Sequence, residues 1–370
     1  MPPTSRTAQL ATLLVLATAC GGGSKSNLDL PTTPIKDAAA PKSFFIGAAI
    51  APDLLGNSSY AQTVQQQFNI VTFENQLKWA SVHPSAGTSS GAYSFSVPDQ
   101  MVAFAQQNGM VVRGHNLLWW SYNPSWMATY GSNSGDWQTL LQSHITTVMT
   151  HYAGKIRDWD VINEPFDSDG TLRGSKGPGT VTGDSRQATF VDWYNKLGSD
   201  YITKAFEWAH AADPDARLFL NEYGVELPGA KADGLFNLVK DLKASGVPID
   251  GVGFQFHFSG VNGDGSTNPE PNYAAIESNL QRFIALGLEV QLTEADYRLS
   301  SNASASLFTQ QANFFSQLVA ILLRNGQNTF VVWGVDDAHS WLGSSAQALL
   351  FDSSYQPKPA VTSILAVLGQ

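Results

Sequence analysis

Cysteine is nearly absent from this chain, and charged residues are scarce. Among 370 residues there is one cysteine, Cys20, so the sequence allows no internal disulfide and no site in which several thiolates bind a metal. Charged residues make up only 14% of the chain, against about a quarter in an average protein. The surface must therefore be rich in uncharged polar residues. A hydrophobic fraction of 43% is still enough for a sizeable core.

Positive charge is the scarcer of the two signs. Lys and Arg number 21 against 31 Asp and Glu, which gives a net charge of -10. This balance repels phosphate backbones and anionic headgroups, so it argues against nucleic acid as a partner. A neutral polymer fits the charge balance better.

The first 20 residues contain no apolar run long enough to span a bilayer, but they resemble an export signal. Arg6 precedes the short apolar stretch Leu10–Ala19. The small residues before Cys20 and the following Gly21–Ser24 resemble a bacterial lipoprotein signal, in which the cysteine is lipidated. We therefore expect an exported lipoprotein at the cell surface or outer membrane. The alternative is plain secretion with an incidental Cys20, since Ala17 stands where that pattern prefers Leu.

The rest of the chain is predicted to hold one linker and one domain. Residues 21–41 are rich in Gly, Ser, Thr, Pro, Asp and Ala, a composition typical of a flexible tether. From residue 42 to residue 370 the pattern stays uniform, with no second linker and no sequence-identical repeat. This stretch is predicted to be a single catalytic domain.

Short apolar runs alternate with helical patterns along this domain. The predicted strands are 44–49, 70–74, 111–115, 159–163, 218–222, 252–257, 290–294 and 330–334. The predicted helices are 60–68, 98–108, 137–152, 190–212, 232–245, 273–286, 307–324 and a last one after Pro357. This alternation indicates right-handed βαβ units and a parallel sheet.

The number of units and the loop lengths predict a closed (β/α)8 TIM barrel. Connections from helix to strand are short, whereas those from strand to helix are long and polar, notably 166–187, 258–272 and 335–356. Long loops after the strands build the catalytic face of such a barrel. The competing open, doubly wound sheet is disfavoured because no glycine-rich phosphate loop follows the first strand.

Polar side chains close almost every predicted strand, and they would meet at one end of the barrel. Sugar rings present several hydroxyls that need partners when water is removed, so this arrangement predicts a sugar-binding cleft. The strand-end residues are Glu74, Asn75, Lys78, His115, Trp119, Asn163, Glu164, Asn221, Glu222, Tyr223, Gln255, His257, Glu294, Asp296 and Trp333, with Trp341 in the last loop.

Two of these residues, Glu164 and Glu294, each close a buried apolar run. Paired carboxyls at strand ends are what cleavage of a glycosidic bond requires, because one donates a proton while the other attacks the sugar or activates water. The alternative is a pair of glutamates in structural salt bridges.

Six motifs resemble those of glycoside hydrolase family 10, the retaining endo-β-1,4-xylanases, over roughly residue 43 to the C-terminus. They are FENQLKW at 73–79, RGHNLLW at 113–119, WDVINEP at 159–165, GFQFHF at 253–258, LTEAD at 292–296, and WGV at 333–335 with Trp341. Each motif by itself is moderately specific. All six occur in the order and spacing of the family, which makes the resemblance strong.

The resemblance implies catalytic roles. Glu164 would be the general acid/base and Glu294 the nucleophile. His257 would hydrogen-bond the nucleophile, with Asp296 orienting the imidazole. Asn163 would bind the sugar 2-hydroxyl, a contact that strengthens in the transition state.

The resemblance also implies a set of sugar contacts. Lys78 could instead be an ion-pair partner of Glu74, and Trp79, Trp120 and Trp126 are interpreted as braces of the loops. No cofactor is expected, and no metal site, since the histidines lack ligand spacing. The expected sugar-binding residues are Glu74, Asn75, Lys78, His115, Trp119, Tyr223, Gln255, Trp333 and Trp341.

The predicted function is an endo-β-1,4-xylanase that acts as a monomer on xylan and xylo-oligosaccharides. A related barrel β-glucanase or cellobiosidase is one alternative, because Leu342-Gly343 follows Trp341 where the family often has a basic residue. A non-catalytic surface glycan-binding protein is the other, although a binder has no need of both glutamates.

Overall fold

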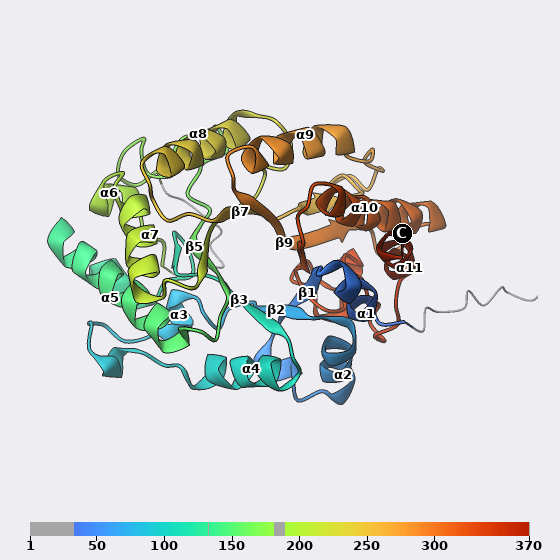
Figure 1. Cartoon of the computed structure of the whole chain (residues 1–370), viewed down its shortest axis with the longest axis horizontal. Helices are drawn as coiled ribbons and strands as arrows, with labels where there is room; N and C mark the ends of the chain where they lie inside the picture. Colours follow the sequence, from blue (N-terminus) through green and yellow to red (C-terminus); the bar gives the residue numbers. More distant parts are fainter. Residues whose placement is uncertain (1–32, 132, 181–188, 370) are drawn as a thin grey trace, which may run out of the picture. The chain divides into compact units, whose positions relative to one another are not determined.

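Parallel strands close into a barrel in the computed structural model, which describes residues 33–131, 133–180 and 189–369 (Figure 1). The ring runs from β1 through β2, β3, β5, β6, β7 and β9 to β10, which pairs again with β1. The predicted (β/α)8 barrel is confirmed. The strands of the ring are β1 (Phe45–Ile50), β2 (Ile70–Phe73), β3 (Val111–Gly114), β5 (Asp158–Asn163), β6 (Arg217–Glu222), β7 (Gly251–Phe254), β9 (Glu289–Arg298) and β10 (Thr329–Val332).

Two short strands extend the ring at its carboxyl end. β4 (Leu118–Trp119) pairs with the end of β5, and β8 (His257–Ser259) pairs with the end of β9. Both continue the sheet above the closed barrel, so their side chains can reach the cleft.

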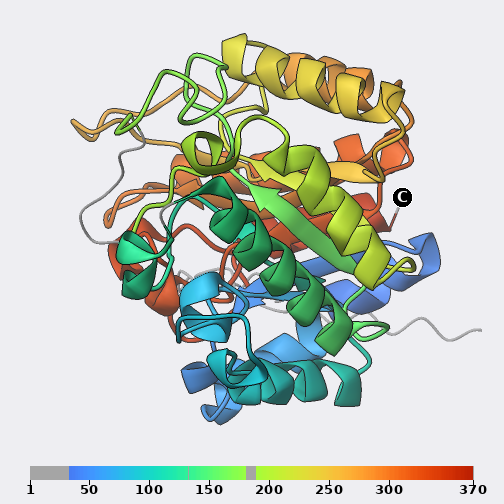
Figure 2. The same ribbon diagram turned by 90° about the vertical axis from the view of Figure 1, so that its left-hand side faces the viewer.

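Helices surround the strands (Figures 1 and 2). In the described ranges, none of them is long and apolar enough to cross a membrane. They are α1 (Ile35–Ala39), α2 (Ser58–Gln67), α3 (Trp79–Val82), α4 (Ser96–Gln107), α5 (Ser134–Tyr152), α6 (Trp193–Leu197), α7 (Tyr201–Ala212), α8 (Ala230–Ala244), α9 (Tyr273–Ile284), α10 (Ala305–Arg324) and α11 (Pro359–Leu368).

Several helices begin at a side chain that satisfies their free N–H groups. Asn57, Asn133, Asn272 and Ser304 accept hydrogen bonds from the first turns of α2, α5, α9 and α10, respectively. Pro359 begins α11, as expected for a first-turn proline. The longer helices bury a row of apolar side chains, as α7 does with Ile202, Ala205, Phe206 and Ala209.

Three predicted elements differ in the structure. The single helix predicted over 190–212 is two helices, because Asp192 caps α6 and Gly198, with φ 75°, ends it. The strand predicted over 252–257 ends at Phe254, since Phe256 has a left-handed φ of 64°. Part of the expected linker 21–41 forms α1, which packs against α11.

The barrel interior carries a buried polar layer beneath the cleft. Arg113 pairs with Asp160, and its Nε–H donates to Gln291 at 2.8 Å. Asp160 in turn contacts His115 Nδ1 at 2.8 Å. Because every member has a partner, the layer can hold His115 rigidly under the site.

Candidate active site

A cleft of about 500 Å³ opens at the carboxyl ends of the strands. Parallel barrel strands all point to this end, so residues far apart in sequence meet there. The cleft is lined by Glu74, Asn75, Lys78, His115, Trp119, Trp120, Tyr122, Asn163, Glu164, Tyr223, Gln255, His257, Glu294, Trp333 and Trp341.

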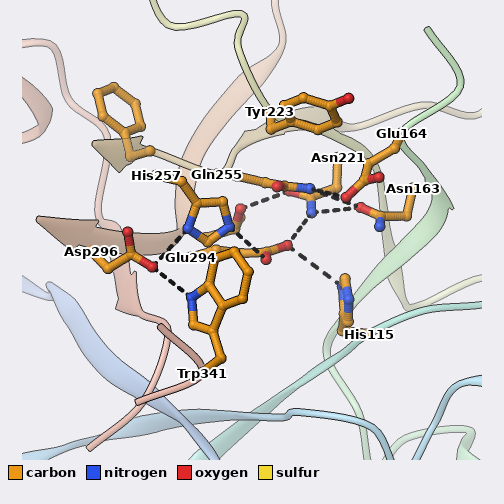
Figure 3. A network of polar contacts seen from close by, with 12 residues as sticks. His115, Asn163, Glu164, Asn221, Tyr223, Gln255, His257, Glu294, Asp296 and Trp341 are labelled. Atoms are coloured by element: carbon orange, nitrogen blue, oxygen red, sulfur yellow. Dashed lines mark hydrogen bonds and ion pairs between the residues drawn. The ribbon is translucent and has the colours of Figure 1, made fainter. Parts of the chain in front are cut away.

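Glu294 lies within β9 and is only 5% exposed. Its Oε1 accepts a hydrogen bond from Asn221 Nδ2 at 2.7 Å, and its Oε2 lies 3.3 Å from His257 Nε2 (Figure 3). His115 Nδ1 lies 3.9 Å from Oε1. The carboxylate is therefore held from three sides.

These neighbours keep Glu294 ionised. Burial on its own would raise the pKa of this carboxyl, but the hydrogen bond from His257 and the charges of the two histidines lower it to about 2. Burial likewise opposes a charge on His257, yet the carboxylates of Asp296 and Glu294 hold the pKa of its imidazole well above the ordinary value. Asp296 Oδ2 lies 2.8 Å from His257 Nδ1 and orients the ring.

Glu164 directly follows β5 and is partly buried. Its φ of 54° is in the left-handed region, where non-glycine residues are uncommon. Oε2 accepts from the indole N–H groups of Trp119 at 2.9 Å and Trp120 at 3.2 Å. Oε1 accepts from Gln255 Nε2 at 3.1 Å. The donors fix the plane of the carboxyl at the cleft.

Three amide side chains link the two glutamates. Asn221 Nδ2 donates both to Glu294 and to Asn163 Oδ1, the latter at 2.9 Å. Gln255 Nε2 lies 3.3 Å from the same Asn163 oxygen while donating to Glu164 (Figure 3). Asn163 and Asn221 are register partners on β5 and β6. Both carboxyls therefore belong to one hydrogen-bonded network.

Lys78 lies in the wall formed by the loop after β2. Its Nζ donates to Asn75 Oδ1 at 3.0 Å and lies 4.8 Å from the Trp119 ring centroid. Burial lowers the pKa of Lys78 to about 8, although the charges of Glu294, Glu164 and Glu74 act in the opposite direction. Burial raises the pKa of Glu74 and the charge of Lys78 opposes that rise, so the alternative of an ion pair between the two stays a prediction.

Two exposed aromatic residues also line the cleft. Trp341 is 59% exposed, and its indole N–H donates to Asp296 Oδ2 at 2.8 Å. Tyr223 is 40% exposed, with Lys231 Nζ 3.2 Å from its ring centroid. Exposed rings fixed at one edge can cover the apolar C–H faces of sugars.

The structure gathers the predicted site residues in one place. All of them line the cleft except Asp296, which lies behind His257, and Cys20, which lies outside the described residues. Their catalytic and binding roles stay predictions.

Sequence reasoning missed three residues near the chemistry. Trp120 was interpreted as a loop brace, but it binds the Glu164 carboxyl and lines the cleft. Tyr122 also lines it, and Asn221 was a strand-end residue without a role. By contrast, Trp79 is buried and donates to the Leu117 carbonyl, in agreement with a brace. The adjacency of Trp119 and Trp120 was the signal available in the sequence.

Known proteins resemble this chain over most of its length. The sequence model of the family described as Glycosyl hydrolase family 10 matches residues 34–367. Endo-1,4-beta-xylanase B of Thermotoga neapolitana is 32% identical, and the match covers 98% of each chain. The crystal structure of xylanase 10B from Thermotoga petrophila RKU-1 in complex with xylobiose has a TM-score of 0.80 and 33% identity, over 92% of this chain and 98% of that one.

Some relatives are much longer than this chain. Endo-1,4-beta-xylanase A of Thermoanaerobacterium saccharolyticum is 36% identical over 87% of this chain, but the match spans 27% of that protein.

Proposed function

Because the chain belongs to glycosyl hydrolase family 10, we propose that it is an endo-1,4-β-xylanase that hydrolyses internal bonds of xylan with retention of anomeric configuration. The observation that carries this function is the placement of Glu164 and Glu294 on one cleft, linked through three amides. Paired carboxyls with different surroundings can divide the acid and nucleophile roles.

In the first step, the ionised Glu294 attacks the anomeric carbon. Glu164 gives its proton to the glycosidic oxygen as the bond between that oxygen and the anomeric carbon breaks. A covalent ester between Glu294 and the sugar results, and the shortened chain leaves as an alcohol. Ionisation of Glu294 well below neutral pH makes it available as the nucleophile.

In the second step, water replaces the enzyme on the anomeric carbon. Glu164, now a carboxylate, takes a proton from the attacking water, and the ester bond breaks to restore ionised Glu294. Two inversions at the same carbon give net retention. The reaction needs no cofactor.

Neighbouring residues support both steps. His257, held by Asp296, keeps Glu294 aimed and ionised. Asn163 lines the cleft and its Oδ1 already accepts from Asn221 and Gln255, which leaves its amide N–H groups to donate to the sugar 2-hydroxyl. Lys78 and Trp119 then form the wall of a sugar subsite.

Release of reducing sugar from xylan, carboxymethylcellulose and mixed-linkage β-glucan tests the substrate class. We expect rapid release from xylan and slow release from the two glucans. Preferred hydrolysis of a glucan would favour the β-glucanase or cellobiosidase alternative. Binding to xylan without release would indicate a surface glycan-binding protein.

Export and lipidation at Cys20 are proposed as well. Support comes from the sequence alone, in the order of Arg6, the apolar stretch Leu10–Ala19 and the cysteine. A monomer is proposed because the large exposed hydrophobic residues of the described ranges are few and scattered, and two of the four, Tyr223 and Trp341, line the cleft.

A further inference from the structure

Arg173 binds the main chain of the segment that carries Glu164. Its backbone N–H donates to the Pro165 carbonyl at 2.7 Å. The guanidinium donates through NH2 to the Phe166 carbonyl at 2.8 Å and through Nε to the Glu164 carbonyl at 3.3 Å. One residue thus holds three consecutive carbonyls, beginning with that of the glutamate itself.

Glu164 needs such support because of its backbone conformation. Its φ of 54° is unfavourable for a residue with a Cβ and persists only where the surroundings fix it. Arg173 is itself fixed, since its side chain is 10% exposed and NH1 lies 3.2 Å from Asp167 Oδ1. Loss of the guanidinium would free the main chain at the point where Glu164 begins.

The same guanidinium also covers Trp120. The guanidinium carbon of Arg173 lies 4.4 Å from the Trp120 ring centroid, a cation–π distance, and Phe190 stacks on this ring with centroids 5.2 Å apart. Held in this way, Trp120 directs its indole N–H to Glu164 Oε2, where the N–H of Trp119 also arrives.

The two indoles make the oxygens of Glu164 unequal. A carboxylate oxygen has two lone-pair directions, and two N–H donors converge on Oε2. Oε1 accepts from Gln255 and keeps a second direction for a proton. The oxygen that exchanges the proton with the glycosidic oxygen is therefore Oε1.

We propose that Arg173 and Trp120 are positioning residues for the acid/base, with Arg173 fixing the backbone of Glu164 and the ring of Trp120 so that Oε1 faces the scissile bond. This inference rests on the proposed function. In the first step the proton moves from Oε1 to the leaving oxygen, which also receives the electron pair of the breaking bond. A leaving group that is stable as an anion needs no proton. Displacement of the acid should therefore slow cleavage only of substrates with poor leaving groups.

The test compares phenyl and 2,4-dinitrophenyl β-xylobiosides as substrates of Trp120→Phe and Arg173→Met. Trp120→Phe keeps an aromatic ring but removes the N–H donor. We expect kcat/KM for the phenyl substrate to fall about 10- to 100-fold. This is less than the loss expected when the general acid is removed completely. We expect kcat/KM for the dinitrophenyl substrate to stay within about threefold, because that step is uncatalysed by the acid. Glu164→Ala removes the acid altogether, so it shows the largest difference between the losses of kcat/KM on the two substrates.

Matched variants outside the site control for general damage. Trp126 Nε1 is buried without a partner in the described chain, so Trp126→Phe loses an indole N–H that binds nothing. Arg282 stacks over Phe236 at 4.8 Å and pairs with Asp233, so Arg282→Met loses a comparable guanidinium. Both variants should leave the ratio of kcat/KM for the phenyl substrate to kcat/KM for the dinitrophenyl substrate unchanged.

Two results would overturn the inference. If kcat/KM falls equally on both substrates, Arg173 and Trp120 only stabilise the fold. If kcat/KM stays at the wild-type value on both substrates, the two residues do not act on Glu164. If Arg173→Met does not fold, Trp120→Phe decides the question by itself. Wild-type protein that cleaves neither xyloside would contradict the proposed function instead.

Discussion

At the scale of single residues, the two glutamates of the cleft differ in the charge of their neighbours. Burial would raise the pKa of Glu294, but the hydrogen bond from His257 and the charges of His115 and His257 lower it to about 2. Glu164 accepts its hydrogen bonds from two indole N–H groups and one amide, none of which carries a charge. This difference supports the proposed division of roles, with Glu294 as the nucleophile and Glu164 as the acid/base.

Replacing the nucleophile tests this division. Glu294→Ala should lower kcat on xylan by about 10⁴-fold or more, since no other group can form the ester. Added azide should restore cleavage of activated xylosides and yield the α-xylosyl azide, because a single displacement inverts the anomeric carbon. Glu164→Ala with azide should instead yield the β-azide. A β-azide from Glu294→Ala would assign the nucleophile to another residue.

The charge of Lys78 predicts how sugar binding depends on pH. Burial lowers the pKa of Lys78 to about 8, so the side chain is a cation at neutral pH and loses its charge as the pH rises through 8. A charged donor binds a hydroxyl more strongly than a neutral one, so xylobiose affinity should fall by about three- to tenfold between roughly pH 7 and 9.5. Calorimetric titration measures this affinity. Lys78→Gln should bind weakly at every pH, and a flat wild-type profile would remove Lys78 from the subsite.

The sequence could predict which residues reach the cleft but not every contact between them. Strand-end motifs placed Glu164, Glu294 and His257 at the same end of the barrel, as the structure has them. The contact between Trp120 and Glu164 depends on how a loop folds over the next strand, and no periodicity encodes that. The hydrogen bond from Arg173 to the Glu164 carbonyl likewise depends on how the chain turns after β5.

At the scale of elements, a glycine in β7 gives Asn221 access to the nucleophile. A Cβ at Gly253 would lie 2.2 Å from Asn221 Oδ1 and 2.9 Å from Thr293 Cγ2. Since Asn221 donates to Glu294, the small residue on one strand allows a contact between its two neighbours. The barrel ring and the catalytic network are therefore coupled at this position.

Gly253→Ala should consequently damage activity as well as stability. Overpacking in a barrel core should lower the free energy of unfolding by about 1–3 kcal/mol, and chemical denaturation measures this change. Activity per folded molecule should fall by at least about tenfold, because the displaced Asn221 no longer holds Glu294. Gly251→Ala is the matched control: a Cβ there would lie 2.4 Å from the Glu289 carbonyl oxygen, at the opposite end of the same strand. Equal specific activity in both variants would contradict the coupling.

Element types followed from periodicity, whereas breaks within elements did not. Each predicted barrel strand overlaps an observed one, because strands buried on both faces read as apolar runs. The break between α6 and α7 arises from the positive φ of Gly198, a signal that the helical pattern concealed. The helix α1 was missed because it has only five residues and buries only Ile35 and Ala39.

At the scale of the whole molecule, the proposed anchor can be tested independently of the barrel. Cys20 lies outside the described residues, and the barrel begins well after it. If Cys20 is lipidated, Cys20→Ser should move the protein from the membrane fraction to the soluble fraction with unchanged specific activity on soluble xylo-oligosaccharides. Identical fractionation of wild type and variant would contradict lipidation, and the barrel assignment would be unaffected.

The anomeric configuration of the first sugar released tests the retaining pair most directly. Proton NMR of xylotetraose mixed with fresh enzyme should show β-anomer first, with α-anomer growing only at the rate of mutarotation. That result requires two displacements, one by Glu294 and one by water activated by Glu164. Initial release of the α-anomer would mean a single displacement, and it would contradict both the nucleophilic role of Glu294 and the acid/base role of Glu164.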